Sequence, residues 1–242
     1  DNYRNEKLKL FKVTKNMHVV NTDDENAKYF WEIPAKQKIN FSIKDAENIK
    51  FDSELIKGFN ILNALAAISV AKAYGISFDI CKSALEKIKG ISGRMEVVVE
   101  SPFKVVVDYA HTPAQLETVY KNFKGKNLVC VFGSCGGGRD KWKRPVFGEI
   151  AKKYCRDIII TNEDPYDEDP MEIINQIAEV AGPKAIKVLD RKEAIEKAIK
   201  IAKPEDIVII TGKGSEPWMC IENGRKIPWD DRQIARDAVR GT

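Results

Sequence analysis

Short apolar runs alternate with helix-like segments through the second half of this chain. The runs Leu128–Phe132, 157–161 and 206–211 each have the length of a strand and are separated by helical patterns. Parallel strands need a crossover connection, usually a helix, and strands buried on both faces are apolar along their whole length. The pattern therefore predicts an α/β fold with a Rossmann-like, doubly wound parallel sheet.

Further elements are expected around this sheet. Two valine strands, at 97–99 and 105–107, are joined by a turn at Ser101-Pro102. Asp190 and Glu193 resemble a capping box at the start of a helix. Helices are expected at 113–122, 145–154, 170–180, 190–200 and 230–240.

The first ninety residues have a different pattern. Residues 60–74 are rich in alanine and aliphatic side chains, which predicts a buried helix, and a second helix is expected after it. Gly90 and Gly93 then interrupt the chain. We therefore expect two domains, 1–92 and 93–242.

The composition narrows the class of protein. Forty basic residues are offset by thirty-six acidic ones, a bias too weak to indicate a nucleic-acid partner. The apolar runs are too short for membrane insertion, and no signal peptide is apparent. The five cysteines include no CxxC pair, so we expect a reduced, cytoplasmic protein in which Cys130 is a small core residue and neither a disulfide framework nor a zinc site is present.

The loop after the first apolar run is rich in glycine. Residues 133–140 read Gly-Ser-Cys-Gly-Gly-Gly-Arg-Asp. Glycines let backbone N–H groups approach an anion closely, and Arg139 can bind a carboxylate or phosphate with two hydrogen bonds. The alternative is a flexible connector, because the loop matches neither a P-loop nor a dinucleotide-binding fingerprint.

Two more loops follow the other apolar runs. Residues 162–170 contain five carboxylates, among them Glu163 and Asp164, and could bind an amine or a cation. Residues 212–216 read Gly-Lys-Gly-Ser-Glu, so that glycines frame a lysine and Glu216 follows. The alternatives are a solvated acidic loop and an ordinary tight connection.

A histidine follows the second valine strand. Residues 108–113 read Asp-Tyr-Ala-His-Thr-Pro, which places His111 at a strand end near Asp108 and just before a helix start. His18 has no comparable neighbours, and we regard it as incidental.

These segments, in this order, resemble the Mur ligase family, and most of all its UDP-N-acetylmuramoyl-tripeptide synthetase (MurE-type) branch. The matching segments are 3–11, 21–24, 60–67, 93–96, 108–113, 132–140, 143–145, 212–216 and 230–232. The resemblance implies that 93–242 is the family's C-terminal domain. It also implies that 1–92 is the rear part of the central α/β ATPase domain, which is incomplete here because the P-loop is missing.

The resemblance also implies an activity. Ligases of this branch use ATP and Mg²⁺ to convert a peptide carboxylate into an acyl phosphate, which the amine of an amino acid then attacks. The substrates would be UDP-N-acetylmuramoyl-L-Ala-D-Glu and a free amino acid (diaminopimelate, lysine or another diamino acid), and the product a peptidoglycan precursor. We expect a monomer.

Site residues carry over by position. Lys7 matches the lysine that becomes a carbamate and helps to hold Mg²⁺, which prefers oxygen ligands. The nucleotide contacts would be Asn63, Arg94, Asp108 and His111, with His111 also close to the chemistry. Arg139 would bind the carboxylate of the incoming amino acid. The rest of the amino-acid pocket would be Glu163, Asp164, Tyr166, Gly212 and Glu216.

The chain departs from the family pattern in three places. No glycine-rich loop with Lys-Thr is present, so the phosphates would lack their main cradle and we expect this polypeptide to be inactive alone. Tyr166 stands where members that add diaminopimelate have an arginine, which leaves the identity of the amino acid open. Ser215 and Ala114 also replace the usual histidine and aspartate.

Three other interpretations remain. The chain could come from another ligase of the superfamily, such as a folylpolyglutamate or cyanophycin synthetase. A dinucleotide-binding oxidoreductase could use the glycines at 133–138, with Glu163 holding a ribose, but would leave Lys7 and Asn63 unexplained. A non-catalytic module derived from a ligase would explain the missing P-loop.

Overall fold

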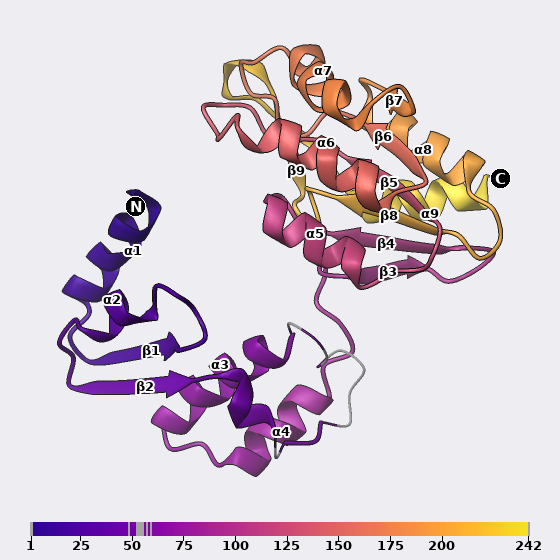
Figure 1. Ribbon diagram of the computed structural model, residues 1–242. Helices are drawn as coiled ribbons and strands as arrows, with labels where there is room; N and C mark the ends of the chain where they lie inside the picture. The colour runs from indigo at the N-terminus through magenta and orange to yellow at the C-terminus, as the bar shows by residue number, and fades with distance from the viewer. Residues whose placement is uncertain (1, 48, 52–55, 57, 59, 242) are drawn as a thin grey trace. The chain divides into compact units, whose positions relative to one another are not determined.

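The computed structural model describes residues 2–47, 49–51, 56, 58 and 60–241. The chain forms two compact units, Asp1–Gly90 and Ile91–Thr242 (Figure 1). Each unit has its own sheet, and each is described by itself.

The first unit combines helices with a small parallel sheet. Strands β1 (Met17–Asn21) and β2 (Gln37–Phe41) pair in parallel. The helices are α1 (Asn2–Val13), α2 (Ala27–Trp31), the 3-10 turn η1 (Ile43–Ala46), α3 (Asn60–Ala73) and α4 (Phe78–Glu86). Helix α3 forms as expected, but only one face of it is buried, at Ala64, Leu65 and Ile68. The predicted buried helix is therefore buried on one side only, and Val70 is 42% exposed.

The second unit is built on a six-stranded sheet with the order β3-β4-β8-β5-β6-β7. All neighbouring strands are parallel except β3 and β4, which the turn at Ser101-Pro102 joins as an antiparallel pair. The predicted doubly wound sheet is confirmed. Its strands are β3 (Glu96–Val99), β4 (Lys104–Asp108), β5 (Leu128–Phe132), β6 (Asp157–Ile160), β7 (Ala185–Lys187) and β8 (Ile207–Thr211).

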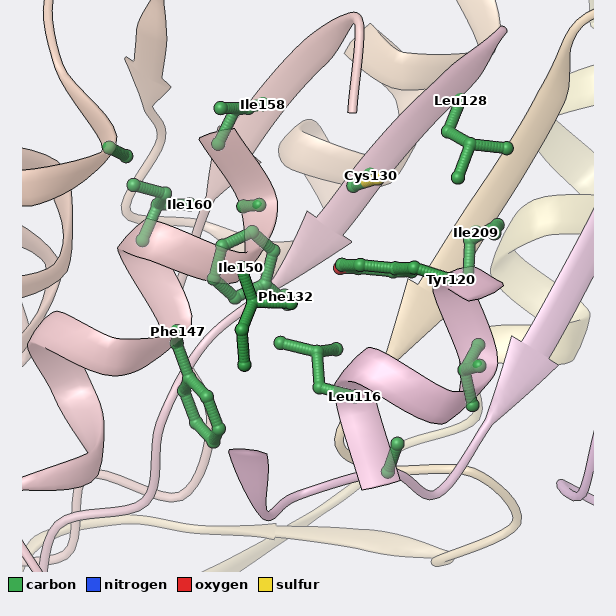
Figure 2. Close-up of a cluster of buried hydrophobic side chains, with 14 of the residues drawn as sticks. Leu116, Tyr120, Leu128, Cys130, Phe132, Phe147, Ile150, Ile158, Ile160 and Ile209 are labelled. Atoms are coloured by element: carbon green, nitrogen blue, oxygen red, sulfur yellow. The ribbon is translucent and has the colours of Figure 1, made fainter. Parts of the chain in front are cut away.

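Helices cover both faces of this sheet. Successive side chains of a strand point to opposite faces, so Cys130 and Phe132 of β5 join one core cluster while Val129 and Val131 join the other. Figure 2 shows the first cluster, in which Tyr120 and Phe147 pack on the strands. Its helices are α5 (Pro113–Lys121), α6 (Lys143–Tyr154) and α7 (Pro170–Ala181), and the opposite face carries α8 (Arg191–Ile201) and α9 (Asp231–Arg240).

Side-chain caps fix where these helices begin. The Thr112 hydroxyl accepts a hydrogen bond from Gln115 N–H before Pro113 opens α5. The Asp190 carboxylate accepts one from Glu193 N–H, as the capping pattern indicates. Because each cap residue is also the last residue of the loop before its helix, these bonds fix where the loops after β4 and β7 end.

A disulfide joins Cys130 of β5 to Cys155, the residue that ends α6. Cys130 lies in the core as predicted, but the expectation that all five cysteines are reduced is wrong. The two residues are 25 positions apart, and only the crossover through α6 brings their Cα atoms to 6.0 Å. No local spacing could reveal this pairing.

A hairpin follows β8, with β9 (Trp218–Cys220) antiparallel to β10 (Lys226–Pro228) and the 3-10 turn η2 (Glu222–Gly224) between them. Among the residues that the structure describes, no helix has the length and apolar character needed to cross a membrane.

Candidate functional site

Four loops meet at one edge of the second unit's sheet. They follow β4, β5, β6 and β8, which lie side by side and parallel, so their carboxyl ends face the same way. Backbone hydrogen bonds join the loops: Gly212 N–H donates to Asp108 C=O at 3.2 Å, and Gly136 N–H donates to Asp164 C=O at 2.9 Å. Ligands of doubly wound folds bind at this edge.

Asp108 ends β4 and stabilises its own loop. Its two carboxylate oxygens accept hydrogen bonds from Met95 N–H and Ala110 N–H, both at 2.7 Å. Burial raises the pKa of the Asp108 carboxyl, and the two backbone bonds and the charge of Arg94 oppose that rise. Asp108 therefore holds residues 95 and 110 in place at the edge of the sheet.

The Tyr109 ring, which had no predicted role, lies between two predicted site residues. The Arg94 guanidinium is 4.2 Å from the centre of its ring, and the His111 ring packs edge-on at 4.7 Å. The Tyr109 hydroxyl donates to Glu216 Oε1 at 2.8 Å. Burial and this hydrogen bond raise the pKa of Tyr109 to about 12. The ring thus connects the β4 loop to the β8 loop.

The glycine-rich loop after β5 rests on the acidic loop after β6. A Cβ atom at Gly136 would lie 2.2 Å from Pro165 C=O, and one at Gly137, where φ is +64°, would lie 2.6 Å from the Tyr166 ring. Only glycine permits this approach. Arg139 projects from the loop with an exposed side chain. Its guanidinium has no hydrogen bond or ion pair to any described residue.

Glu168 holds the glycine-rich loop after β5 in place through its carboxylate. Its carboxylate binds Arg144 at 3.0 Å and Lys141 at 3.1 Å, and it accepts a long hydrogen bond from Gly138 N–H at 3.5 Å. Burial acts to raise the pKa of Glu168, but the bonds to Arg144 and Lys141 outweigh it, and the pKa is lowered. The ionised carboxylate therefore ties the turn that carries Arg139 to the start of α6.

Glu163 is a buried carboxylate, 3% exposed, directly after β6. The Cys135 thiol donates to its Oε1 at 3.3 Å. Gly212, with φ of +111°, leaves room for it, because a Cβ there would lie 2.0 Å from Glu163 Oε2. Burial raises the pKa of Glu163, and the charges of Arg191 and Lys143 oppose that rise. This carboxylate has no ion pair within the part of the chain that the structure describes.

Lys213 binds the other two carboxylates of the predicted pocket. Its ammonium donates to both oxygens of Asp164, at 2.7 and 2.8 Å, and to Glu216 at 2.6 Å. Desolvation acts to lower the pKa of Lys213, but these bonds outweigh it and the pKa is raised. Sequence reasoning noted Lys213 between its glycines but assigned it no role, because its partner Asp164 lies 49 residues away.

Tyr166 links two loops and the hairpin. Its backbone is left-handed, with φ of +52°, and its N–H donates to Cys220 C=O at 3.3 Å. A hydrogen bond with Cys220 and partial burial raise the pKa of its hydroxyl. The Tyr166 ring therefore lies against Gly137, next to the turn that carries Arg139.

A fully buried ion pair under the loops was missed from the sequence. The Arg191 guanidinium at the start of α8 binds Asp231 of α9 with two hydrogen bonds, at 2.7 and 2.9 Å. It also donates to Thr211 C=O at 2.8 Å and Asn162 C=O at 3.3 Å. It therefore fixes the ends of β8 and β6, but the 40 residues between Arg191 and Asp231 hide the pairing in the sequence.

Two predicted site residues belong to the first unit. Lys7 is exposed on α1, with its ammonium 5.3 Å from the Tyr3 ring centre. Asn63 is exposed on α3 and donates to Asn60 Oδ1 at 3.1 Å. Over the described residues, no cluster of three or more His, Cys, Asp or Glu side chains could hold a metal ion. The other predicted site residues all lie in the second unit, where Asp108 ends β4 and the rest lie in loops.

Comparison with known proteins bears on this arrangement. The family model described as "Mur ligase, glutamate ligase domain" matches residues 93–214. A UDP-N-acetylmuramoyl-L-alanyl-D-glutamate--2,6-diaminopimelate ligase of Halalkalibacterium halodurans is 38% identical over 249 residues, which cover 92% of this chain and 51% of that protein. The ligase of the same name from Syntrophomonas wolfei is 37% identical and covers 100% of this chain and 56% of that protein.

Solved structures give the same result. A structure of a UDP-N-acetylmuramoyl-L-alanyl-D-glutamate--2,6-diaminopimelate ligase has 30% sequence identity and a TM-score of 0.58. The match covers 99% of this chain and 56% of the chain in that structure. A bifunctional folylpolyglutamate synthase/dihydrofolate synthase from Yersinia pestis has a TM-score of 0.65 at 16% identity, which indicates a shared fold alone. The chain spans about half the length of the curated relatives it matches.

Proposed function

This chain belongs to the Mur ligase family, and on that premise we propose that it is part of an ATP-dependent ligase of peptidoglycan synthesis. The enzyme would add a diamino acid, such as diaminopimelate or lysine, to UDP-N-acetylmuramoyl-L-Ala-D-Glu. ATP would phosphorylate the peptide carboxylate, the amine of the amino acid would attack the acyl phosphate, and phosphate would leave. The names of the relatives support this substrate pair.

The observation that carries the proposal is the charge balance of the amino-acid pocket. Asp164 and Glu216 already share an ion pair with Lys213. Arg139 and Glu163 have no ion pair to the described residues. A cation and an anion on neighbouring loops complement the carboxylate and the ammonium of a free amino acid. Arg139 would bind the carboxylate, and Glu163 would hold the amine.

The nucleotide contacts are proposed on both units. Arg94 and His111 flank the Tyr109 ring at the β4 edge, and Asn63 would contribute from the first unit. We assign residues 1–92 to the rear of the central ATP-binding domain and 93–242 to the C-terminal domain. ATP supplies the phosphoryl group when bound.

Magnesium binding is a separate matter. Lys7 is proposed to act as a carbamate ligand of Mg²⁺, but the described residues contain no cluster of His, Cys, Asp or Glu that could complete such a site. The described residues do not form a metal site by themselves, so the proposed reaction includes no step that depends on Mg²⁺.

The test uses a longer protein that adds the part of the relatives' length absent here. Phosphate release would be measured with ATP, UDP-muramoyl dipeptide and a panel of diaminopimelate, lysine and ornithine. Arg139→Ala should raise the KM for the amino acid by roughly 10- to 150-fold, because it removes a charge-assisted contact of about 1.5–3 kcal/mol, with the KM for ATP little changed.

Arg240→Ala, at an exposed arginine in the last turn of α9, is the matched control and should leave both constants unchanged. An unchanged amino-acid KM in Arg139→Ala would remove that residue from the pocket. No turnover with any amino acid would favour a non-catalytic, ligase-derived module.

A further inference from the structure

Among the described residues, four buried cations lie near the strand-end loops, and they differ in how well they are paired. Arg191 has Asp231, Arg144 has Glu168, and Lys213 has Asp164 and Glu216. Lys143, the first residue of α6, is 7% exposed. Within the described residues no carboxylate lies within 4.0 Å of its ammonium. Buried charges are normally paired, because burial without a partner is costly.

The Lys143 ammonium contacts the main chain of His111, and its charge acts on Glu163, so it is connected to both halves of the proposed site. It donates one long hydrogen bond, at 3.3 Å, to the His111 C=O, and it lies 5.8 Å from the centre of the Phe147 ring. Its charge also acts on the Glu163 carboxyl and the Cys135 thiol. A lysine ammonium has three donors, so two have no described acceptor. His111 belongs to the nucleotide side and Glu163 to the amino-acid side.

We propose that Lys143 binds the transferred phosphoryl group at the point between His111 and Glu163. This inference rests on the proposed ligase function, in which the phosphoryl group must pass from the nucleotide to a carboxylate beside the amino acid. As the amine nitrogen bonds to the carbonyl carbon, the carbon–oxygen bond to phosphate breaks and phosphate leaves with the electron pair. The nitrogen loses a proton to water. A fixed ammonium stabilises the negative charge that grows on the leaving oxygen.

The first test uses this 242-residue chain and inorganic phosphate. Thermal midpoints are measured over a phosphate series at constant ionic strength for the wild type, Lys143→Met and Lys152→Met, the last at an exposed lysine of the same helix. The wild type and Lys152→Met should show a saturable rise in midpoint, because a ligand of the native state stabilises it. Lys143→Met should lose that rise and keep only the general salt effect that all three proteins share.

A purely structural lysine would behave differently. Without phosphate, Lys143→Met should unfold at the same or a higher temperature, because an apolar side chain replaces an incompletely paired buried charge. A lower midpoint for Lys143→Met and Lys143→Gln, or an equal phosphate response in Lys143→Met and Lys152→Met, would overturn the proposal. Lys143→Arg keeps the charge and should keep part of the response.

The second test uses the longer, ATP-binding protein. Lys143→Met should lower kcat by roughly 100- to 1,000-fold, the effect of losing one group that stabilises developing charge, while the amino-acid KM changes less than about threefold. An unchanged kcat would overturn the proposal. If the wild type has no ligase activity, the proposed function fails, and the phosphate response of the shorter chain still decides whether Lys143 binds an anion.

Discussion

Glu163 and Asp164 are adjacent in the sequence but differ in their electrostatic environment. Asp164 shares the Lys213 ammonium with Glu216, so its charge is compensated within the fold. Glu163 is buried against Cys135 and Gly212 without a close cation among the described residues. The protein thus keeps one unpaired carboxylate at a strand end, which costs stability and is the expected mark of a group kept for ligand binding.

Glu163→Gln tests this directly. Burial raises the folded-state pKa of Glu163, so the ionised group lowers stability as the pH rises from its unfolded pKa, roughly 4.3, through the folded value. At neutral pH the neutral amide should therefore increase the free energy of unfolding, and at pH values below the unfolded pKa the gain should disappear. Urea denaturation at the two pH values measures both.

Glu179→Gln, at an exposed glutamate of α7, provides the control and should change stability by less than about 0.5 kcal/mol at either pH. A loss of stability in Glu163→Gln at neutral pH would mean that the carboxylate contributes to the fold. In the longer protein used to test the proposed function, the same substitution should still weaken amino-acid binding.

At the scale of elements, β6 and β8 end in loops that lie in contact. The contact depends on Gly212, because its φ of +111° is left-handed and its missing Cβ makes room for Glu163. We predict that Gly212→Ala destabilises by more than about 3 kcal/mol, since backbone strain of about 1–3 kcal/mol is added to a displaced buried carboxylate. Chemical denaturation measures the change.

A substitution at Gly182 separates the backbone strain from the displacement of Glu163. It ends α7 with φ of +89°, but a Cβ there would meet nothing within 4 Å. Gly182→Ala should therefore show the backbone cost alone, about 1–3 kcal/mol at its φ of +89° and ψ of −175°. Equal losses at Gly182 and Gly212 would show that the space for Glu163 is not what selects glycine after β8.

Helices and strands were predicted correctly from the sequence where a continuous apolar run or a capping residue marks them. The strands β5 and β8 are unbroken apolar runs, and α5, α8 and α9 begin at side-chain caps. The short β7 and the β9–β10 hairpin were missed, because they have only three residues per strand and no strong apolar pattern.

The sequence predicted which loops converge at the candidate site, but it did not predict the partners of their side chains. Convergence of the β4, β5, β6 and β8 loops follows from parallel topology. The pairing of Lys213 with Asp164, of Arg191 with Asp231 and of Cys130 with Cys155 joins residues that are far apart along the chain. Such partners become neighbours only after the crossovers are built, so no local pattern encodes them.

The whole molecule consists of two units with unequal cores. In residues 91–242, two apolar clusters cover both faces of a six-stranded sheet. Among the described residues of 1–90, the buried apolar side chains are few, namely Val20, Phe41, Ile56, Ala64, Leu65, Ile68 and Cys81. The first unit has a sheet of only two parallel strands, although parallel sheets are normally larger and covered on both faces.

This imbalance predicts two separate unfolding transitions in scanning calorimetry. The Asp1–Gly90 unit should melt first, because less buried apolar surface gives less stabilisation per residue. Leu65→Ala, at a buried position of α3, should lower only the midpoint temperature of the first transition. Ile195→Ala, at a buried position of α8, should lower only the midpoint temperature of the second. Each should cost about 2–5 kcal/mol within its own unit. A single transition whose calorimetric and van't Hoff enthalpies agree for the whole chain, shifted by either substitution, would instead mean that the units fold as one cooperative body.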